Sequence, residues 1–484
     1  MKYFLIIIPL IFIFSIGFCQ KAPSEIDQQE LKKIIHILTA DSLEGRGTGT
    51  EGQKKAGKYI NESFKRIGLS PFHQGSYFEN FELKQSYWGE VYLETAKVKL
   101  INFENMVFQG RTVYHSEVER EIVFGGRGTE EELNQIDVVD RFVFIFAENL
   151  RAGSEISRIL AKRKAFGVIL ANPKNEVQFE SIKRTFKDFS LAKRFALQKE
   201  DNSDNRQTNW DTIKSVNSIL IPNSQIKNVM GLSMAKLKKL IEQNKISEAP
   251  TVKVKAKFER VVNNIETTNI VGILEGKTDK TIVVTAHYDH LGKTDKKYFP
   301  GADDNASGVA ALLELAEYFS SLKNLNYSMM FLAVSAEEAG LLGSSFHVNK
   351  DSFNPENILC TINIDMISRI DDRHEKADYL YCIGSDQSEN LDKLIKEADQ
   401  SFADCSFDYS MNNTKDPLGI FTRSDHYNFY KKGIPSLFFF SGLHQDYHKT
   451  TDTPEKINYK NLEYRVQLIA QVIEQLQKKG LTNE

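Results

Sequence analysis

Two adjacent glutamates, Glu337 and Glu338, come shortly after the apolar run YSMMFLAV at residues 327–334. A continuous apolar run of this length predicts a strand that is buried on both faces, as in a parallel sheet. Open α/β sheets bind their ligands at the carboxyl ends of such strands. The pair therefore indicates a chemical site at that edge if other strands bring partner side chains to it.

Further histidine and carboxylate side chains follow other predicted strands. His287 and Asp289 follow TIVVTA, Asp365 follows ILCTINI, GADDNASG precedes a predicted helix, and SGLHQDYHKTTDTPEKI follows PSLFFF. Carboxylates that converge on one edge repel one another unless cations lie between them. Mixed histidine and carboxylate ligands without a thiolate suit zinc, with cobalt or manganese as substitutes. One of the adjacent glutamates would then bind metal while the other acts as a general base.

The elements that must position these residues form two patterns. From about residue 271, apolar strands alternate with helical stretches such as VAALLELAEYFSSL, which predicts an α/β fold with a mostly parallel, mixed sheet flanked by helices. Residues 97–254 instead contain short alternating strands and predict a β-rich inserted domain. The main domain is then discontinuous and comprises residues 20–96 and 255–484.

Composition bounds the class of protein. The chain has 484 residues and a formal net charge of -3, which excludes the basic bias of nucleic-acid binders. Residues 1–19 resemble a signal peptide, with one lysine, an apolar stretch and small residues near Cys19. We therefore expect export to the periplasm or the medium, and no stable membrane span after the signal is removed. The three remaining cysteines, Cys360, Cys382 and Cys405, allow at most one disulfide.

Five motifs, in chain order, carry a family resemblance. HYDHLG, GADDNASG, SAEEAGLLGS, NIDM and YHKTTDTPEKI resemble those of the co-catalytic di-zinc aminopeptidases, which include secreted bacterial leucyl aminopeptidases and, more distantly, glutamate carboxypeptidase. LEGRGTGTEG resembles the opening loop of this family, and the inserted segment is similar to its protease-associated domain. The resemblance implies the zinc exopeptidase fold, of the phosphorylase/hydrolase-like type, and two zinc ions per chain.

The same resemblance assigns metal ligands. His287 and Asp365 would hold one zinc, Glu338 and His448 the other, and Asp304 would bridge the two.

It also assigns the catalytic residues. Glu337 would be the general base that acts on a metal-bridging water. Asp289 would orient His287, Tyr447 would donate a hydrogen bond to the tetrahedral oxyanion, and Arg423 in FTRSDHYNF would position substrate.

Some positions have close competitors. Asp303 competes with Asp304 as the bridge and His444 competes with His448, and in both cases the spacing of the family motif favours the latter. We interpret His290 and His426 as structural residues, or as residues that support ligands without binding metal.

The resulting prediction is an exported metallo-aminopeptidase that hydrolyses the N-terminal bond of peptides with a free amino terminus. A glutaminyl cyclase with a single zinc and a carboxypeptidase for acidic dipeptides are the alternatives. A receptor-like relative without catalysis should lack ligands, whereas all five metal positions and the base are present here.

Overall fold

The computed structural model describes residues 25–72, 75–110, 113–147, 149–172, 177–191, 193–198, 215–294, 297–322, 324–412 and 419–481. The predicted signal segment, residues 1–19, lies outside the described residues. Within them, no helix is long and apolar enough to cross a membrane. The chain divides into two compact units. The first comprises Met1–Phe81 together with Glu266–Glu484, and the second comprises Glu82–Ile265. The predicted insertion, residues 97–254, falls inside the second unit.

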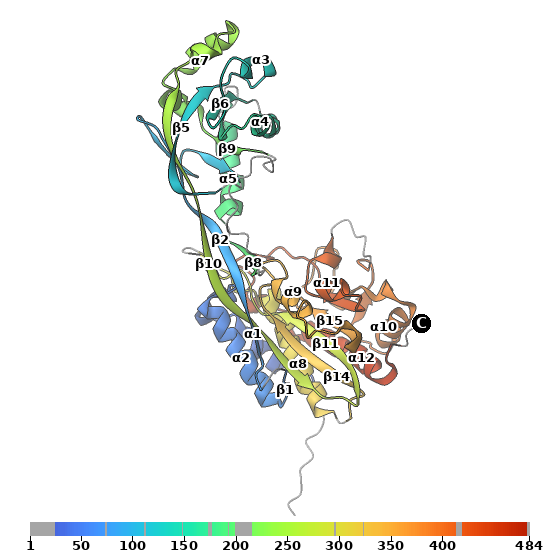
Figure 1. Cartoon of the computed structure of the whole chain (residues 1–484). Helices are drawn as coiled ribbons and strands as arrows, with labels where there is room; N and C mark the ends of the chain where they lie inside the picture. Colours follow the sequence, from blue (N-terminus) through green and yellow to red (C-terminus); the bar gives the residue numbers. More distant parts are fainter. Residues whose placement is uncertain are drawn as a thin grey trace, which may run out of the picture. The chain divides into compact units, whose positions relative to one another are not determined.

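The first unit contains a mixed sheet of the kind predicted (Figure 1). Its strands lie in the order β17-β16-β18-β15-β11-β14-β10, and β1 also pairs with β10. The central strands β14, β11, β15 and β18 are parallel, whereas β10 and β16 are antiparallel to their neighbours β14 and β18. The bounds are β1 Ser70–Pro71, β10 Val252–Leu274, β11 Thr278–His287, β14 Tyr327–Val334, β15 Ile358–Ile364, β16 Tyr379–Ile383, β17 Ser406–Asp408 and β18 Ser436–Phe440.

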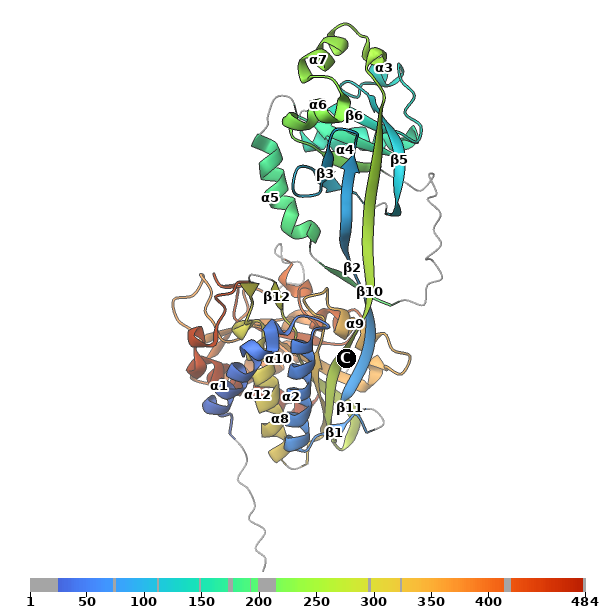
Figure 2. The ribbon, with the colours of Figure 1, turned by 90° about the vertical axis from the view of Figure 1, so that its left-hand side faces the viewer.

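Helices cover both faces of this sheet, as Figures 1 and 2 show. The apolar side chains of α1, α2, α8, α10 and α12 share one core with one face of the strands, and α9 and α11 pack on the other face. These helices are α1 Gln28–Leu38, α2 Glu51–Ile67, α8 Gly308–Ser321, α9 Leu342–Val348, α10 Glu389–Gln400, α11 His426–Tyr430 and α12 Tyr459–Lys479.

Strand β14 illustrates why the apolar runs are continuous. Met329 and Phe331 point into the core beneath α8, whereas Met330 and Leu332 point to the opposite face. Successive strand residues face opposite sides, so a strand covered by helices on both faces needs apolar residues at every position. The predicted α/β fold with a mostly parallel, mixed sheet is thereby confirmed.

Beyond β10 the same sheet continues in the second unit through β5, β6, β7, β9 and β4 in that order, and β2 pairs with β10, β3 and β8. Its helices are α3 Glu130–Leu133, α4 Leu150–Lys162, α5 Val177–Leu191, α6 Ile226–Met230 and α7 Met234–Glu242. Its strands are β2 Phe78–Glu94, β3 Lys99–Ile101, β4 Val107–Gln109, β5 Tyr114–Phe124, β6 Phe142–Phe146, β7 Gly167–Ala171, β8 Arg194–Leu197 and β9 Asn217–Leu220. The resemblance of this unit to a protease-associated domain stays a prediction.

Candidate metal centre

Three neighbouring strands bring the predicted residues to one edge of the first unit's sheet. Strand β11 pairs in parallel with both β14 and β15, so the carboxyl ends of all three meet at the same edge. His287 is the last residue of β11 and pairs with Val334 at the end of β14. Glu337 and Glu338 follow β14, and Asp365 follows β15. Residues separated by long stretches of chain therefore converge.

One group of donor atoms forms around His287. Its Nε2 atom lies 3.3 Å from Oδ1 of Asp365 and 3.4 Å from Oδ1 of Asp304. All three residues are buried, and their donor atoms all lie within 4.8 Å of one another. Ligand atoms at about 2.0–2.2 Å from one tetrahedral zinc lie roughly 3.3 Å apart. This group therefore has the spacing of a single cation site.

A second group forms on the other side of Asp304. His448 Nε2 lies 3.2 Å from Oδ2 of Asp304 and 3.2 Å from Oε2 of Glu338. His290 Nδ1 lies 2.8 Å from Oε1 of Glu338 and 3.7 Å from Oδ2 of Asp304. Asp304 thus turns one oxygen to each group, which is the orientation expected of a bridging carboxylate. The His448 side chain is 36% exposed, so this group is open to solvent.

The charges of the two groups test whether cations fit. Burial, together with repulsion from Glu338 and Asp365, raises the pKa of Glu337 well above its usual value, although His287 opposes the shift. Buried carboxylates at this density are unfavourable unless cations neutralise them. The donors are imidazole nitrogens and carboxylate oxygens, and none of the three described cysteines belongs to either group. This donor set fits zinc.

Glu337 lies beside the first group without belonging to it. Its Oε2 atom is 4.0 Å from Nε2 of His287, and its side chain is 11% exposed. Its main-chain N–H donates to Oδ1 of Asp289 at 3.1 Å. The carboxylate is therefore near enough to accept a proton from a molecule bound between the groups.

Asp289 supports the site in a different way from the one predicted. The Nδ1 atom of His287 lies 3.1 Å from the main-chain carbonyl of Asp289 and 3.9 Å from its carboxylate. The carboxylate instead accepts hydrogen bonds from the Glu337 main chain and, at 2.7 Å, from the Thr48 hydroxyl. Burial raises the pKa of Asp289 to about 6. Asp289 therefore contacts both the ligand His287 and the segment that carries the glutamates.

The two competing residues contact each other outside these groups. Oδ2 of Asp303 lies 3.2 Å from Nε2 of His444, and Oδ1 accepts hydrogen bonds from the main chain and hydroxyl of Ser368. Although burial opposes the shift, His444 and Ser368 hold the pKa of Asp303 below its usual value. Neither residue is in a potential metal group of the described part of the chain.

His426 and His290, the two histidines that we interpreted as not binding metal, lie in different environments. The ring of His426 is fully buried and stacks on Phe438 with centroids 4.7 Å apart. Burial lowers the pKa of His426 to about 3, so the ring is neutral and structural. His290 instead faces Glu338 inside the second group.

Tyr447 and Arg423 form a pair at the exposed side of the second group. The Tyr447 ring stacks on His448 with centroids 3.8 Å apart, and Nη2 of the exposed Arg423 donates to the Tyr447 hydroxyl at 3.3 Å. Burial and the negative charges of Asp304 and Glu338 raise the pKa of Tyr447. The phenol therefore keeps its proton and can donate a hydrogen bond.

One residue that the sequence interpretation missed holds the bridging loop. Asp452 accepts main-chain N–H groups from Asp303 at 3.0 Å and from Asp304 at 3.2 Å. Asp452 lies in the motif YHKTTDTPEKI, so the sequence did mark this aspartate. The motif spacing by itself, however, does not show which groups Asp452 contacts.

Arg46 is the second missed residue. Its fully buried guanidinium donates to four main-chain carbonyls, those of Leu38, Tyr288, Pro300 and Gly301. These lie at the end of α1, just after β11 and directly before the bridging loop. Arg46 therefore joins the end of α1 to the two segments that carry His287 and Asp304, and it comes from the predicted opening loop LEGRGTGTEG.

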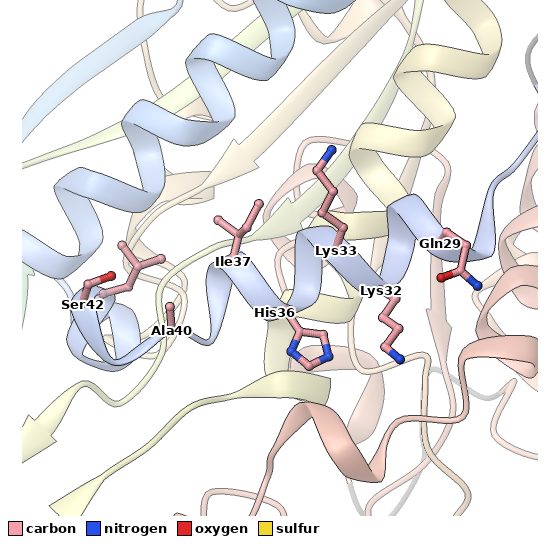
Figure 3. A pocket seen from close by; sticks show the side chains of 8 residues that line it. Gln29, Lys32, Lys33, His36, Ile37, Ala40 and Ser42 are labelled. Atoms are coloured by element: carbon pink, nitrogen blue, oxygen red, sulfur yellow. The ribbon is translucent and has the colours of Figure 1, made fainter.

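A separate hollow of about 570 Å³ lies along α1 (Figure 3). Lys33 in its wall pairs with Glu30, and Nζ of Lys32 lies 5.6 Å from the centre of the Tyr459 ring. No residue of the two metal groups lines this hollow. The lining residues are Gln29, Lys32, Lys33, His36, Ile37, Ala40, Ser42 and Leu43.

Known proteins resemble part of the chain. Aminopeptidase YwaD of Bacillus subtilis (strain 168) is 31% identical over 240 residues, which cover 47% of this chain and 48% of that protein. A probable leucine aminopeptidase of Arthroderma otae is 26% identical over 38% of this chain and 49% of its own. The chain thus spans about half the length of these two curated relatives.

Solved structures match over a longer stretch. The aminopeptidase from Aneurinibacillus sp. strain AM-1 gives a TM-score of 0.52 at 20% identity, over 95% of this chain and 96% of its own. The zinc aminopeptidase BSAP from Bacillus subtilis gives a TM-score of 0.53 at 20% identity, over 94% of this chain and 96% of its own. At this identity the match concerns the fold. Residues 269–473, which include both metal groups, match the model of Peptidase family M28.

Proposed function

We propose that the protein is a zinc aminopeptidase that hydrolyses the N-terminal peptide bond of peptides. The observation that carries the proposal is the pair of donor groups that share Asp304, with the largely buried Glu337 beside them. The family match of residues 269–473 and the aminopeptidase names of the relatives support the same reaction class.

Each donor group would hold one zinc. His287 and Asp365 would bind the first ion, Glu338 and His448 the second, and Asp304 both. When bound, the ions would supply an activated water and polarise the scissile carbonyl. The carboxylates around them would also attract the positively charged amino terminus of a peptide. Binding of that terminus would restrict cleavage to the first peptide bond.

Glu337 would act as the general base and then as the acid. Its carboxylate would take the proton from the attacking water and pass it to the leaving amine. Its position supports this role, because its Oε2 atom lies 4.0 Å from Nε2 of His287 and so faces the space between the two groups.

Tyr447 and Arg423 would act on the substrate itself. The Tyr447 hydroxyl would donate a hydrogen bond to the carbonyl oxygen as negative charge develops on it. Arg423 donates to that hydroxyl, and its exposed guanidinium would help to position the peptide beyond the scissile bond.

Zinc content and hydrolysis together test this function. We expect about two zinc ions per chain by elemental analysis, and chelator-sensitive release of the first residue from a panel of aminoacyl-anilides. Glu337→Gln should lower kcat by about 10²- to 10⁴-fold while the zinc content is unchanged. Glu314→Gln, which changes a buried glutamate outside the site, is the matched control. Full activity of Glu337→Gln would exclude the base role.

Other outcomes would identify a different enzyme of this fold. One zinc ion with cyclisation of N-terminal glutamine would indicate a glutaminyl cyclase. Release of a C-terminal acidic residue from dipeptides, without hydrolysis of the anilides, would indicate a carboxypeptidase.

We also propose that the protein is exported, on the strength of the apolar segment at residues 1–19. The mass of the protein purified from its native host should match a chain that begins near residue 20. A full-length mass would contradict cleavage.

A further inference from the structure

His290 in HYDHLG has no part in the proposed reaction, yet it faces a ligand of the second group. The two oxygens of Glu338 have different partners, since Oε1 lies 2.8 Å from Nδ1 of His290 and Oε2 lies 3.2 Å from Nε2 of His448. The Glu338 carboxylate is thus held between two imidazoles, one on each oxygen.

The distances separate two roles that His290 could have. Its Nδ1 atom lies close enough to Asp304 and Glu338 to be a third ligand of one ion. Two atoms bound to the same tetrahedral zinc, however, lie roughly 3.3 Å apart. The separation of 2.8 Å between Nδ1 and Oε1 is that of an N–H···O hydrogen bond and is shorter than the spacing of two zinc ligands. The 3.2 Å separations of His448 from Asp304 and Glu338, by contrast, also match the spacing of two zinc ligands.

Packing fixes the His290 ring in this orientation. The side chain is fully buried. A methyl group on Gly301 would lie 2.5 Å from Cδ2 and 2.6 Å from Cγ of the ring, so the imidazole packs directly against this glycine. The carbonyl of Gly301 is in turn held by Arg46. The ring therefore has little freedom to turn away from Glu338.

We propose that His290 positions Glu338 by donating from Nδ1 to Oε1, which leaves Oε2 to bind the second cation. This inference rests on the proposed two-zinc site. The hydrogen bond fixes the rotation of the carboxylate before metal arrives, and so raises the affinity of the second ion without changing the ligands of the first. Groups that orient metal-binding side chains in this way typically change metal affinity by about 10- to 100-fold.

Zinc titration of the metal-free, full-length protein tests the role, with zinc alone as the probe. His290→Ala should weaken the second zinc by about 10- to 100-fold and leave the first unchanged. In His290→Asn the affinity for the second zinc should stay within about threefold of wild type, because the asparagine amide N–H replaces the Nδ1–H donor of His290. His36→Asn, at an exposed histidine of α1, is the control. The visible spectrum of the cobalt-loaded protein should be the same for wild type and His290→Asn.

Three results would overturn the proposal. Equal loss of affinity in His290→Ala and His290→Asn, with an altered cobalt spectrum, would make His290 a ligand. Wild-type affinity in His290→Ala would make it a packing residue only. Failure of the wild type to bind a second zinc would contradict both this inference and the two-zinc function, whereas two bound zincs without hydrolysis of peptides would contradict the function alone.

Discussion

At the scale of residues, the pKa values of the adjacent Glu337 and Glu338 shift in opposite directions because their neighbours differ. Although burial opposes the shift, hydrogen bonds with His290 and His448 lower the pKa of Glu338. Burial and repulsion from Glu338 raise the pKa of Glu337. A carboxylate that stays charged suits a metal ligand, and one with high proton affinity suits a base. The environment therefore gives the two carboxylates of one dipeptide opposite pKa shifts, as the two proposed roles require.

Asp452 offers a test at the same scale. Asp452→Asn removes the charge and one of the oxygens that accept the N–H groups of Asp303 and Asp304. Leaving a buried donor without a partner costs about 1–3 kcal/mol. We expect the free energy of unfolding, measured in urea, to fall by about that amount, and zinc to be lost at a lower chelator concentration. Glu455→Gln, at an exposed residue nearby, is the control. Equal behaviour of the two variants would show that Asp452 does not hold the loop.

At the scale of elements, the helix after the bridging loop is tied to the start of α1. Glu314 on α8 is buried, and its Oε2 atom accepts the main-chain N–H of Asp27, the residue that caps α1. Burial, with repulsion from Glu30 and Asp27, raises the pKa of Glu314 to about 7. The folded protein therefore binds a proton that the unfolded chain releases near pH 4.

The raised pKa of the buried Glu314 predicts a pH dependence of stability. Because the folded pKa is the higher one, the contribution of Glu314 is complete below about pH 4 and is lost as the pH rises through about 7. At 1.36 kcal/mol per pKa unit, the total is at most about 3 kcal/mol. Glu314→Gln should be more stable than wild type in urea at pH 8, with the difference shrinking toward pH 5. Parallel pH profiles for the two proteins would contradict the assignment, and Glu317→Gln on the same helix is the control.

At the scale of the whole molecule, the two metal groups and the proposed base all come from one of the two compact units. Every residue named in them lies in residues 266–484, and Arg46 and Thr48 lie in residues 1–81. The second unit has separate apolar cores, one of them built around Phe124, Phe144 and Phe258. Formation of the metal centre should therefore not depend on the second unit.

A shortened chain tests this independence. Replacing residues 82–265 by an Asn-Gly turn would join β2 to β10, which already pair, through a two-residue hairpin loop. We expect this variant to bind the same number of zinc ions as wild type. Comparing its activity on short and long peptides would then show what the second unit contributes to substrate choice. Loss of zinc from a shortened chain with native helical content would contradict the prediction.

The sequence by itself determined the elements and the types of ligand. Continuous apolar runs predicted β11, β14, β15 and β18 because strands covered on both faces need apolar residues throughout. Motifs at the ends of these strands predicted which histidines and carboxylates would converge, since carboxyl ends of parallel strands meet at one edge. Both predictions depend on local patterns, which the sequence contains directly.

Only the tertiary structure decided which atoms of these residues meet. Asp452 contacts the bridging loop across 148 residues, and His290 reaches Glu338 across 48. The acceptor for His287 is the main-chain carbonyl of Asp289 and not the predicted carboxylate. Such contacts depend on how distant loops pack and on the rotamer each side chain adopts there, and neither is a property of the local sequence.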